Sequence, residues 1–534
     1  MTDRVLLIGL DGGTFATLDP LIEGGVMPFL KEFLASGVRG ELLSVIPPLT
    51  PPGWASLVTG RTPGNHGVMD FFRFESPDSR YIRLVDARDV KCETIWSIVG
   101  RHGLRATVLN FPLMTPARPL AGNVVPGWAP WRYLRRLCFP RDLYDKIKNV
   151  PGFNAQELAM DPKVEGKAIE GSSPEEYEEW ILFHIRRERQ WFEILRYLIY
   201  EDPTDLTAVL FDGIDKLQHL LWRFIDPIYV PTHPSAWEQR IRHLCLDYFR
   251  QLDGLIAELV AMAGAETSVF VASDHGFGPS TEIFYLNTWL HQQGYLEWAN
   301  DAQEDTSEAG RLGLGKISRV PSMVDWGRTT VYGLTPSSNG VHIAVAGRRG
   351  REGIGRQEYA RVRSTLMNQL SRFTDPATGG RVVTRVWTRE EAFPGTQTEM
   401  APDLTLSIRD GGFVSILKSA VVLKPRPEVV GTHRPQGIFI AKGPGIRQGL
   451  SLPALSITDV APTLLYNLGL PVPTDLEGCV AEQIFTPDLL QERSIRIGDP
   501  TRVPEAFPQR RDQSEDLEGE AQVLARLKNL GYVE

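Results

Sequence analysis

Four short apolar runs in this chain end or begin beside residues that bind divalent metals. Short runs rich in Val, Ile and Phe are typical of buried strands. The four are Val5–Leu10 before Asp11, Thr207–Phe211 before Asp215 and His219, Ser268–Ser273 before Asp274 and His275, and Gly437–Ala441 after His433. Each acid or imidazole therefore stands where a buried strand meets a loop. This pattern predicts an α/β sheet with a polar site along one edge.

Three Asp and three His make up a ligand set that suits Zn²⁺ or a similar divalent ion. Six ligands exceed the four of one tetrahedral ion, so the set favours two ions that share a bridging group. Asp215 and His219 are four residues apart, a spacing that places both on one face of a helix. Taken singly, an acid after a strand is also a common helix N-cap. The joint occurrence at four strand ends favours a metal site.

Strand-like runs alternate with helical patterns along the chain. Residues 28–37 are an example, with Pro28 at the start of a helical pattern and Gly37 just past its end. Such alternation predicts a mainly parallel sheet sandwiched between helices. In such sheets the ligand site lies outside the carboxyl ends of the strands, where these acids and imidazoles are expected.

Thr50 is the candidate nucleophile. It precedes Pro51 and Pro52, and residues 54–59 are predicted to be helical. A hydroxyl at a helix N-terminus meets backbone N–H groups and the positive end of the helix dipole, which favour an alkoxide and a bound phosphate. The alternative is that Thr50 only caps the helix, with Pro51 as its first residue.

Together these motifs resemble the type I phosphodiesterase/nucleotide pyrophosphatase branch of the alkaline phosphatase superfamily. The resemblance is carried, in chain order, by Asp11-Gly12, Thr50, Leu57-Val-Thr-Gly60, His66-Gly67, Asp215 with His219, Asp274-His275-Gly276 and Gly431-Thr-His433. Within that branch the chain is similar to the predicted phosphohydrolases and phosphomutases of bacteria and archaea. The resemblance implies an alkaline-phosphatase-like core with two metal ions and the Thr50 oxygen between them. One ion would be held by Asp215, His219 and His433, and the other by Asp11, Asp274 and His275.

One position departs from that family. Nucleotide pyrophosphatases carry an Asn shortly after the His-Gly motif that helps to hold the phosphoryl oxygens, and Phe71 stands there in this chain. Nucleotide and diester specificity is therefore not carried over. Asn110 and Arg61 are the candidate substrate contacts. Each has an alternative role, Asn110 as a turn former after a strand and Arg61 as a surface or supporting cation.

The composition excludes several classes of protein. With 534 residues, 42 % hydrophobic and 23 % charged, the chain is typical of a soluble globular protein. Its net charge of −9 gives no indication of a nucleic-acid or anionic-membrane surface. The four cysteines lie far apart without CxxC spacing, so neither a disulfide framework nor a thiolate zinc site is predicted. The sequence shows no signal-peptide core and no membrane-length apolar run, which predicts a cytoplasmic protein, and it leaves the oligomeric state open.

Residues 1–280 and 429–490 are predicted to form the metal-dependent catalytic core. A mostly helical insertion is expected at about 120–205, because Trp180, Trp191 and Leu195 recur at helical spacing after Ser173. Residues 281–428 contain none of the six candidate ligands and are predicted to form a cap that sets substrate specificity. Residues 491–534 are expected to be a Pro- and charge-rich linker followed by an amphipathic helix over 521–531.

These features favour a two-metal phosphoester hydrolase, either a phosphodiesterase/nucleotide pyrophosphatase or a phosphatase. It would act on a small-molecule phosphoester through a phosphothreonine at Thr50, with Zn²⁺ as the first choice of metal and Mn²⁺ as the alternative. A phosphomutase or phosphotransferase would use the same ligands and differ in the cap. A non-catalytic, metal-stabilised binding protein would be expected to have lost the nucleophile or a ligand. A sulfatase is disfavoured because Thr50-Pro-Pro-Gly-Trp54 lacks the Cys or Ser of the sulfatase motif.

Overall fold

The computed structural model describes residues 4–74, 82–160, 164–165, 167, 173–305, 320–347 and 353–502. The strands of its main sheet are β1 (Arg4–Leu10), β2 (Val38–Leu43), β5 (Ala106–Leu109), β6 (Gly122–Val125), β7 (Leu206–Phe211), β8 (Thr267–Ala272), β15 (Gln436–Lys442), β16 (Leu450–Ser451) and β17 (Leu455–Ser456). This nine-stranded sheet has the order β16-β2-β15-β8-β1-β7-β5-β6, with β17 beside β2. β15 runs antiparallel to β2 and β8, whereas the other neighbours are parallel. The predicted mainly parallel sheet is confirmed.

Helices cover both faces of the sheet. Leu6, Ile8 and Leu10 of β1 pack on one face, and Val5 and Leu7 pack on the other, as the two-residue repeat of a strand requires. The first face carries α1 (Phe15–Glu23), α2 (Pro28–Ala35), α10 (Tyr177–Glu201), α11 (Gly213–Ile225) and α12 (Ala236–Ala263). The second carries α3 (Thr50–Thr59), α5 (Ile95–Arg101) and α18 (Val460–Asn467). Burial on both faces explains why the central strands are apolar almost throughout.

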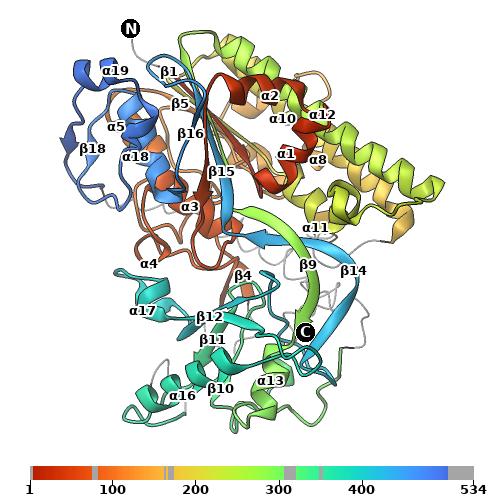
Figure 1. The fold of residues 1–534 in the computed structure, drawn as a ribbon. Helices are drawn as coiled ribbons and strands as arrows, with labels where there is room; N and C mark the ends of the chain where they lie inside the picture. The colour runs from red at the N-terminus through yellow and green to blue at the C-terminus, as the bar shows by residue number, and fades with distance from the viewer. Residues whose placement is uncertain are drawn as a thin grey trace.

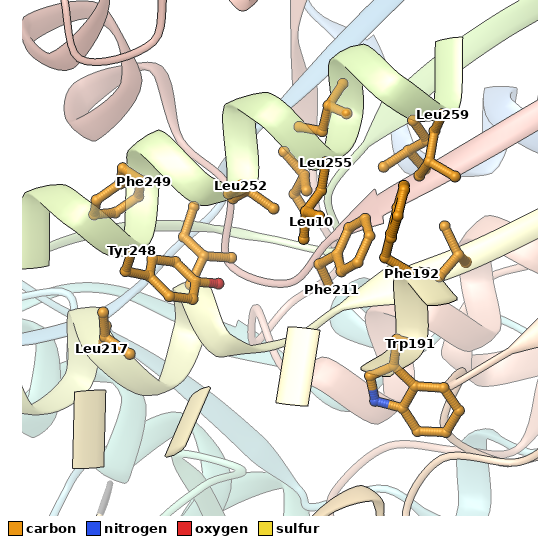
Figure 2. Packing of buried hydrophobic residues seen from close by; sticks show 14 of the residues in the cluster. Leu10, Trp191, Phe192, Phe211, Leu217, Tyr248, Phe249, Leu252, Leu255 and Leu259 are labelled. Atoms are coloured by element: carbon orange, nitrogen blue, oxygen red, sulfur yellow. The ribbon is translucent and has the colours of Figure 1, made fainter. Parts of the chain in front are cut away.

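The core between the sheet and its first layer of helices is rich in large side chains. Figure 2 shows Leu10 and Phe211 from the sheet in the same cluster as Phe192 of α10 and Leu255 of α12. Each fully buried side chain of this size stabilises the fold by roughly 1.5–3 kcal/mol relative to an exposed one. This packing fixes α10, α11 and α12 against the strands whose ends carry the candidate ligands.

The helix expected after Ser173 is present. Ser173 and Glu176 form a capping box on the 3-10 turn η1 (Pro174–Glu176), which leads directly into α10. The start of the expected helical insertion differs from expectation. Residues 122–125 form β6, an edge strand of the main sheet, because the buried Val124 and Val125 pair with β5. The first helix of this region begins only at Trp131.

A two-stranded antiparallel ribbon of β9 (Gly276–Phe284) and β14 (Leu423–Arg434) leads from the upper to the lower part of the molecule (Figure 1). The lower part contains a four-stranded sheet of β10 (Val331–Tyr332), β11 (Gly340–Ile343), β13 (Leu404–Ile408) and β12 (Val383–Thr388), in this order. Its helices are α13 (Leu286–Gln292), α15 (Val320–Met323), α16 (Tyr359–Arg372) and α17 (Arg389–Ala392). These elements enclose a hydrophobic cluster of their own. The division into core, cap and tail by residue number stays a prediction.

The remaining α-helices and strands of the described part of the chain are short. They are α4 (Pro63–His66), β3 (Phe72–Phe74), β4 (Ile82–Leu84), α6 (Trp131–Leu137), α7 (Leu143–Ile147), α8 (Ala155–Leu158), β18 (Val472–Pro473), α19 (Pro487–Glu492) and β19 (Ile497–Gly498). The amphipathic helix predicted over 521–531 lies outside the described residues. Within the described ranges, no helix combines the length and the hydropathy needed to cross a bilayer.

Candidate active site

The six candidate ligands come from separate segments that meet at one edge of the central sheet. They are Asp11 after β1, Asp274 and His275 after β8, Asp215 and His219 on α11 after β7, and His433 near the end of β14. Since β15 follows β14 and runs antiparallel to β8, its first residues lie at the carboxyl end of that strand. The structure therefore brings together the six side chains that the strand-end pattern indicates.

Asp215, His219 and His433 form the first group, called here the Asp215 cluster. The two imidazole Nε2 atoms are 3.0 Å apart. Asp215 Oδ1 lies 3.3 Å from His433 Nε2 and 3.5 Å from His219 Nε2. Two ligand atoms that each lie about 2.1 Å from one tetrahedral ion are roughly 3.4 Å apart. The three distances therefore match a site for one ion.

Asp11, Asp274 and His275 form the second group, the Asp11 cluster. His275 Nε2 lies 3.2 Å from Asp274 Oδ2 and 3.6 Å from Asp11 Oδ1. The imidazole of His275 also stacks on that of His433, with ring centroids 3.7 Å apart. Ligand atoms of His275, His433 and Asp215 all lie within 4.8 Å of one another. His275 thus lies between the two clusters.

Hydrogen bonds from neighbouring groups orient these ligands. Pro48 O lies 2.9 Å from His433 Nδ1, and Gly276 O lies 3.1 Å from His275 Nδ1. A carbonyl only accepts, so both Nδ1 atoms carry the proton and both Nε2 atoms keep a lone pair for a cation. The N–H of Gly12 donates to Asp274 Oδ1 at 3.1 Å. Supporting bonds of this kind fix the tautomer and the orientation of metal ligands.

The donor set fits divalent cations. Asp11 Oδ1, Asp215 Oδ1 and Asp274 Oδ2 are buried and accept no hydrogen bond among the described residues. Burial raises the pKa of Asp11 well above its ordinary value, and the nearby Asp274 and Asp215 raise it further. Burial also lowers the pKa of His219 to about 3, so this imidazole supplies no positive charge at neutral pH. Buried carboxylates without a counter-charge are costly, and bound cations would supply that charge.

Thr50 is the first residue of α3, and the N-cap is Leu49. The alternative in which Thr50 caps the helix is therefore not what the structure shows. Instead, Thr50 Oγ1 lies 3.2 Å from His275 Nε2, at the ligand between the two clusters. Gly53 permits this approach, because a Cβ atom there would lie 2.8 Å from the carbonyl oxygen of Asp274.

The N-terminus of α3 offers an anion fewer backbone N–H donors than the sequence suggests. Pro51 and Pro52 have no N–H, and the N–H of Gly53 donates to Leu49 O. Within this first turn, Thr50 alone keeps an N–H that the helix does not use. The helix dipole still favours negative charge near Thr50, but the expected cluster of backbone donors is absent from this turn.

The two candidate substrate contacts have other partners. Asn110 follows β5 with a φ of 65°, and its amide donates to Leu210 O at 2.9 Å and to Asp212 Oδ1 at 3.3 Å. Arg61 forms ion pairs with Asp475 at 2.6 Å and with Glu477 at 3.4 Å. The alternative roles are thus the ones that the geometry favours: Asn110 shapes the turn at the end of β5, and Arg61 supports the loop after α3.

Three further charged residues lie near the site. They are Arg187 and Glu188 of α10, and Glu165. Arg187 Nη1 lies 2.6 Å from Glu165 Oε1, and Lys216 Nζ lies 3.8 Å from Glu165 Oε2. Glu188 accepts the N–H of Gly213 at 2.7 Å, at the start of α11. Sequence reasoning passed over Glu165 and Glu188, because an acid inside an expected helical insertion carries no strand-end signal. The hint in the sequence was that Arg187 and Glu188 fall at the same helical spacing as Trp180 and Trp191.

A largely parallel sheet between helices, with two Asp/His clusters beside a hydroxyl at its carboxyl edge, defines an α/β enzyme of the alkaline-phosphatase type. The chain belongs to the type I phosphodiesterase/nucleotide pyrophosphatase family, whose sequence model matches residues 5–436. It is therefore a phosphoester hydrolase by family, and the resemblance drawn from the motifs is confirmed.

Solved structures with TM-scores of 0.50 and above share this fold at low sequence identity. Murine ectonucleotide pyrophosphatase/phosphodiesterase 5, solved as an inactive Thr-to-Ala variant in complex with AMP, is 15 % identical over 91 % of this chain and 100 % of its own, with a TM-score of 0.52. The human protein of the same name is 14 % identical over 92 % and 99 %, with a TM-score of 0.50. Phosphonoacetate hydrolase from Sinorhizobium meliloti 1021, in complex with phosphonoformate, is 17 % identical over 87 % and 95 %, with a TM-score of 0.49.

Proposed function

We propose that this protein is a two-metal phosphoester hydrolase in which Thr50 is the nucleophile. The observation that carries the proposal is the 3.2 Å contact of Thr50 Oγ1 with His275 Nε2, because His275 lies between the two clusters. Zn²⁺ is the expected ion, given the mixture of imidazole and carboxylate ligands, and Mn²⁺ is the alternative. Asp215, His219 and His433 would hold one ion, and Asp11, Asp274 and His275 would hold the other.

When bound, two such ions would supply the positive charge that lowers the pKa of the Thr50 hydroxyl and stabilises both apical oxygens of an in-line displacement. Thr50 Oγ loses its proton to solvent and forms a bond to phosphorus, while the ester bond to the alcohol breaks and the alcohol takes up a proton. Water then attacks the phosphothreonine and loses a proton, while the P–O bond to Thr50 breaks and Thr50 Oγ takes up a proton. The products are the alcohol and either phosphate or, from a diester, a monoester.

Two comparisons support this proposal. The family description names phosphodiester and pyrophosphate hydrolysis. The murine relative was obtained with AMP, a small phosphoester, in a form that a Thr-to-Ala substitution makes inactive. The family description agrees with a phosphoester substrate for this chain, and the murine relative agrees with a hydroxyl nucleophile and a small-molecule substrate.

The test is a screen of zinc-loaded protein against bis-p-nitrophenyl phosphate, p-nitrophenyl phosphate and nucleoside triphosphates, with an added alcohol in a parallel series. The proposal predicts release of p-nitrophenol or phosphate from at least one ester. Phosphate transfer to the alcohol in place of release would identify a phosphotransferase. If protein that holds two ions per chain turned over none of these esters, the proposal would be wrong.

A further inference from the structure

A phosphoryl group at Thr50 needs donors for its non-bridging oxygens, and the expected donors are largely engaged elsewhere. The amide of Asn110 is turned to the end of β7. The guanidinium of Arg61 forms ion pairs with Asp475 and Glu477. The first turn of α3 offers the single N–H of Thr50. These three groups therefore leave the non-bridging oxygens short of donors, and a cationic side chain at the site could bind them.

Among the described residues, Lys216 is the lysine or arginine whose side chain contacts the side chain of a candidate ligand. Its Nζ lies 3.4 Å from Asp215 Oδ2 and 3.8 Å from Glu165 Oε2, and its side chain is only 16 % exposed. An ammonium group carries three donors, and one long hydrogen bond uses one of them. Because unmade hydrogen bonds to a buried charge are costly, this ammonium is poised for a further acceptor.

The ammonium contacts the oxygen of Asp215 that the two imidazoles of the Asp215 cluster leave free. Asp215 Oδ1 faces His219 and His433, at 3.5 and 3.3 Å, whereas Oδ2 faces Lys216. The Lys216 charge also acts on Asp11, which belongs to the other cluster. Lys216 therefore lies where its field reaches both clusters, and it leaves the imidazole side of Asp215 open to an ion.

Glu165 limits where Lys216 can move. Its carboxylate forms an ion pair with the fully buried Arg187 at 2.6 Å and stands 3.8 Å from the ammonium. Arg187 is in turn 3.8 Å from Asp212, at the start of the loop that leads into α11. A partner at 3.8 Å attracts the ammonium without satisfying its donors, so Glu165 orients Lys216 and leaves it able to bind an anion.

We propose, resting on the phosphoester hydrolase proposed above, that Lys216 donates a hydrogen bond to a non-bridging phosphoryl oxygen of the substrate. The contact is a charge-assisted hydrogen bond. It is strongest for a dianionic phosphoryl group, as in a phosphomonoester or inorganic phosphate, and weaker for a monoanionic phosphodiester. Lys216 therefore biases the site towards monoesters.

The proposal is tested with inorganic phosphate, titrated calorimetrically into the full-length metal-loaded protein. Lys216→Met should weaken phosphate binding about tenfold to a hundredfold, the loss expected for a hydrogen bond to a charged group, with the metal content per chain unchanged. Lys216→Arg should retain binding within a few-fold. In kinetics, Lys216→Met should lose more kcat/KM for p-nitrophenyl phosphate than for bis-p-nitrophenyl phosphate. Lys148→Met, at an exposed ion pair with Asp145 just after the end of α7, is the matched control and should change none of these values.

Two outcomes would overturn the assignment. Unchanged phosphate affinity in Lys216→Met would show that the ammonium does not reach the anion. A fall in metal content in this variant would show that Lys216 serves to position Asp215 instead. If Lys216→Met does not fold, Lys216→Gln takes its place with the same expectations. Absence of ester hydrolysis by the wild type contradicts the proposed function separately, since phosphate binding is measured without turnover.

Discussion

Thr50 stands at the start of a helix, yet its surroundings differ from those of a capping residue. The two residues after it are prolines, which have no N–H for a cap to bind. Its hydroxyl contacts His275 instead. Thr50→Ala therefore removes a nucleophile but no candidate metal ligand. The expected result is less than about 1 % of wild-type turnover, with unchanged thermal stability and metal content.

Two further variants sharpen this prediction. Thr50→Ser should keep partial activity, because a primary hydroxyl can occupy the same place. Thr59→Ala removes a hydroxyl from the other end of α3, where it bonds only to local backbone groups, and should remain active. Steady-state rates and the mass of the acid-quenched enzyme distinguish these cases. Turnover above a few per cent in Thr50→Ala would contradict the covalent mechanism.

Some residues of the site are easier to locate from the sequence than others. Asp11, Asp215, Asp274 and the three histidines could be singled out because each follows or precedes a strand, and parallel strands end at one edge. Their role as metal ligands stays a prediction. Lys216 carries no strand-end signal of this kind, since its importance depends on Glu165, a partner about fifty residues away in the chain. Contacts of this kind have no local sequence pattern.

Among the elements, α11 is the one whose placement matters most, because it carries Asp215 and His219. Glu188 of α10 accepts the N–H of Gly213 at 2.7 Å and the hydroxyl of Tyr248 at 3.0 Å, so it holds the first turn of α11. Burial raises the pKa of Glu188 to about 8, so its carboxyl is mainly neutral at pH 7. A neutral carboxyl still accepts both hydrogen bonds.

The predicted effect of Glu188→Ala is a loss of about 1–2 kcal/mol of stability, because a helix start and a buried hydroxyl lose their acceptor. It should also weaken zinc binding, measured by competition with a chelator. Glu188→Gln, an isostere of the neutral acid, should stay close to wild type. Glu238→Ala removes the exposed capping box of α12 and should lower stability without any change in zinc affinity. Equal zinc affinity in Glu188→Ala and Glu238→Ala would contradict the positioning role.

Element prediction from the sequence succeeded where a helix is long or well marked. α2 begins at Pro28 as expected, and the turn that opens α10 begins at Ser173 with a capping box. β6 was missed because four residues are too few to show a period, and its edge position depends on β5 across the sheet. The pairing that makes it a strand is a tertiary contact.

For the molecule as a whole, the loop after α3 joins the core to the lower part. The hydroxyls of Thr335 and Ser337 both donate to Asp70, and the N–H of Gln397 donates to Gly64 O at 2.7 Å. The segment that carries Thr50 at its start is thus attached to the lower part at two points. Any shift of the lower part against the core would strain these hydrogen bonds.

Asp70 gives this junction a pH dependence. Burial raises the pKa of Asp70 from 3.8 to about 6, although the hydrogen bonds from Ser337 and Thr335 oppose the shift. Between these two values the folded protein binds more protons than the unfolded chain, so the contribution of Asp70 to stability is present below pH 4 and is lost as the pH rises to about 6. Asp70→Asn should lack this component. Urea unfolding of both proteins between pH 4 and 7 measures it, and a constant difference between them would contradict the assignment.

The proposed mechanism depends on two ions that the acids and imidazoles at the sheet edge hold together. Asp11 Oδ1, Asp215 Oδ1 and Asp274 Oδ2 are buried and accept no hydrogen bond among the described residues, and a single ion would leave the free oxygens of either the Asp11 or the Asp215 cluster without a partner. His433→Ala should lower the metal content towards one ion per chain and abolish activity, since a single ion does not stabilise both apical oxygens.

The most direct measurement is the number of metal ions per chain in wild-type protein purified without chelator. Elemental mass spectrometry determines this number on the same sample that is assayed for ester hydrolysis. We predict close to two ions per chain in protein that hydrolyses a phosphoester. Active protein with no ion, or with one, would contradict this prediction.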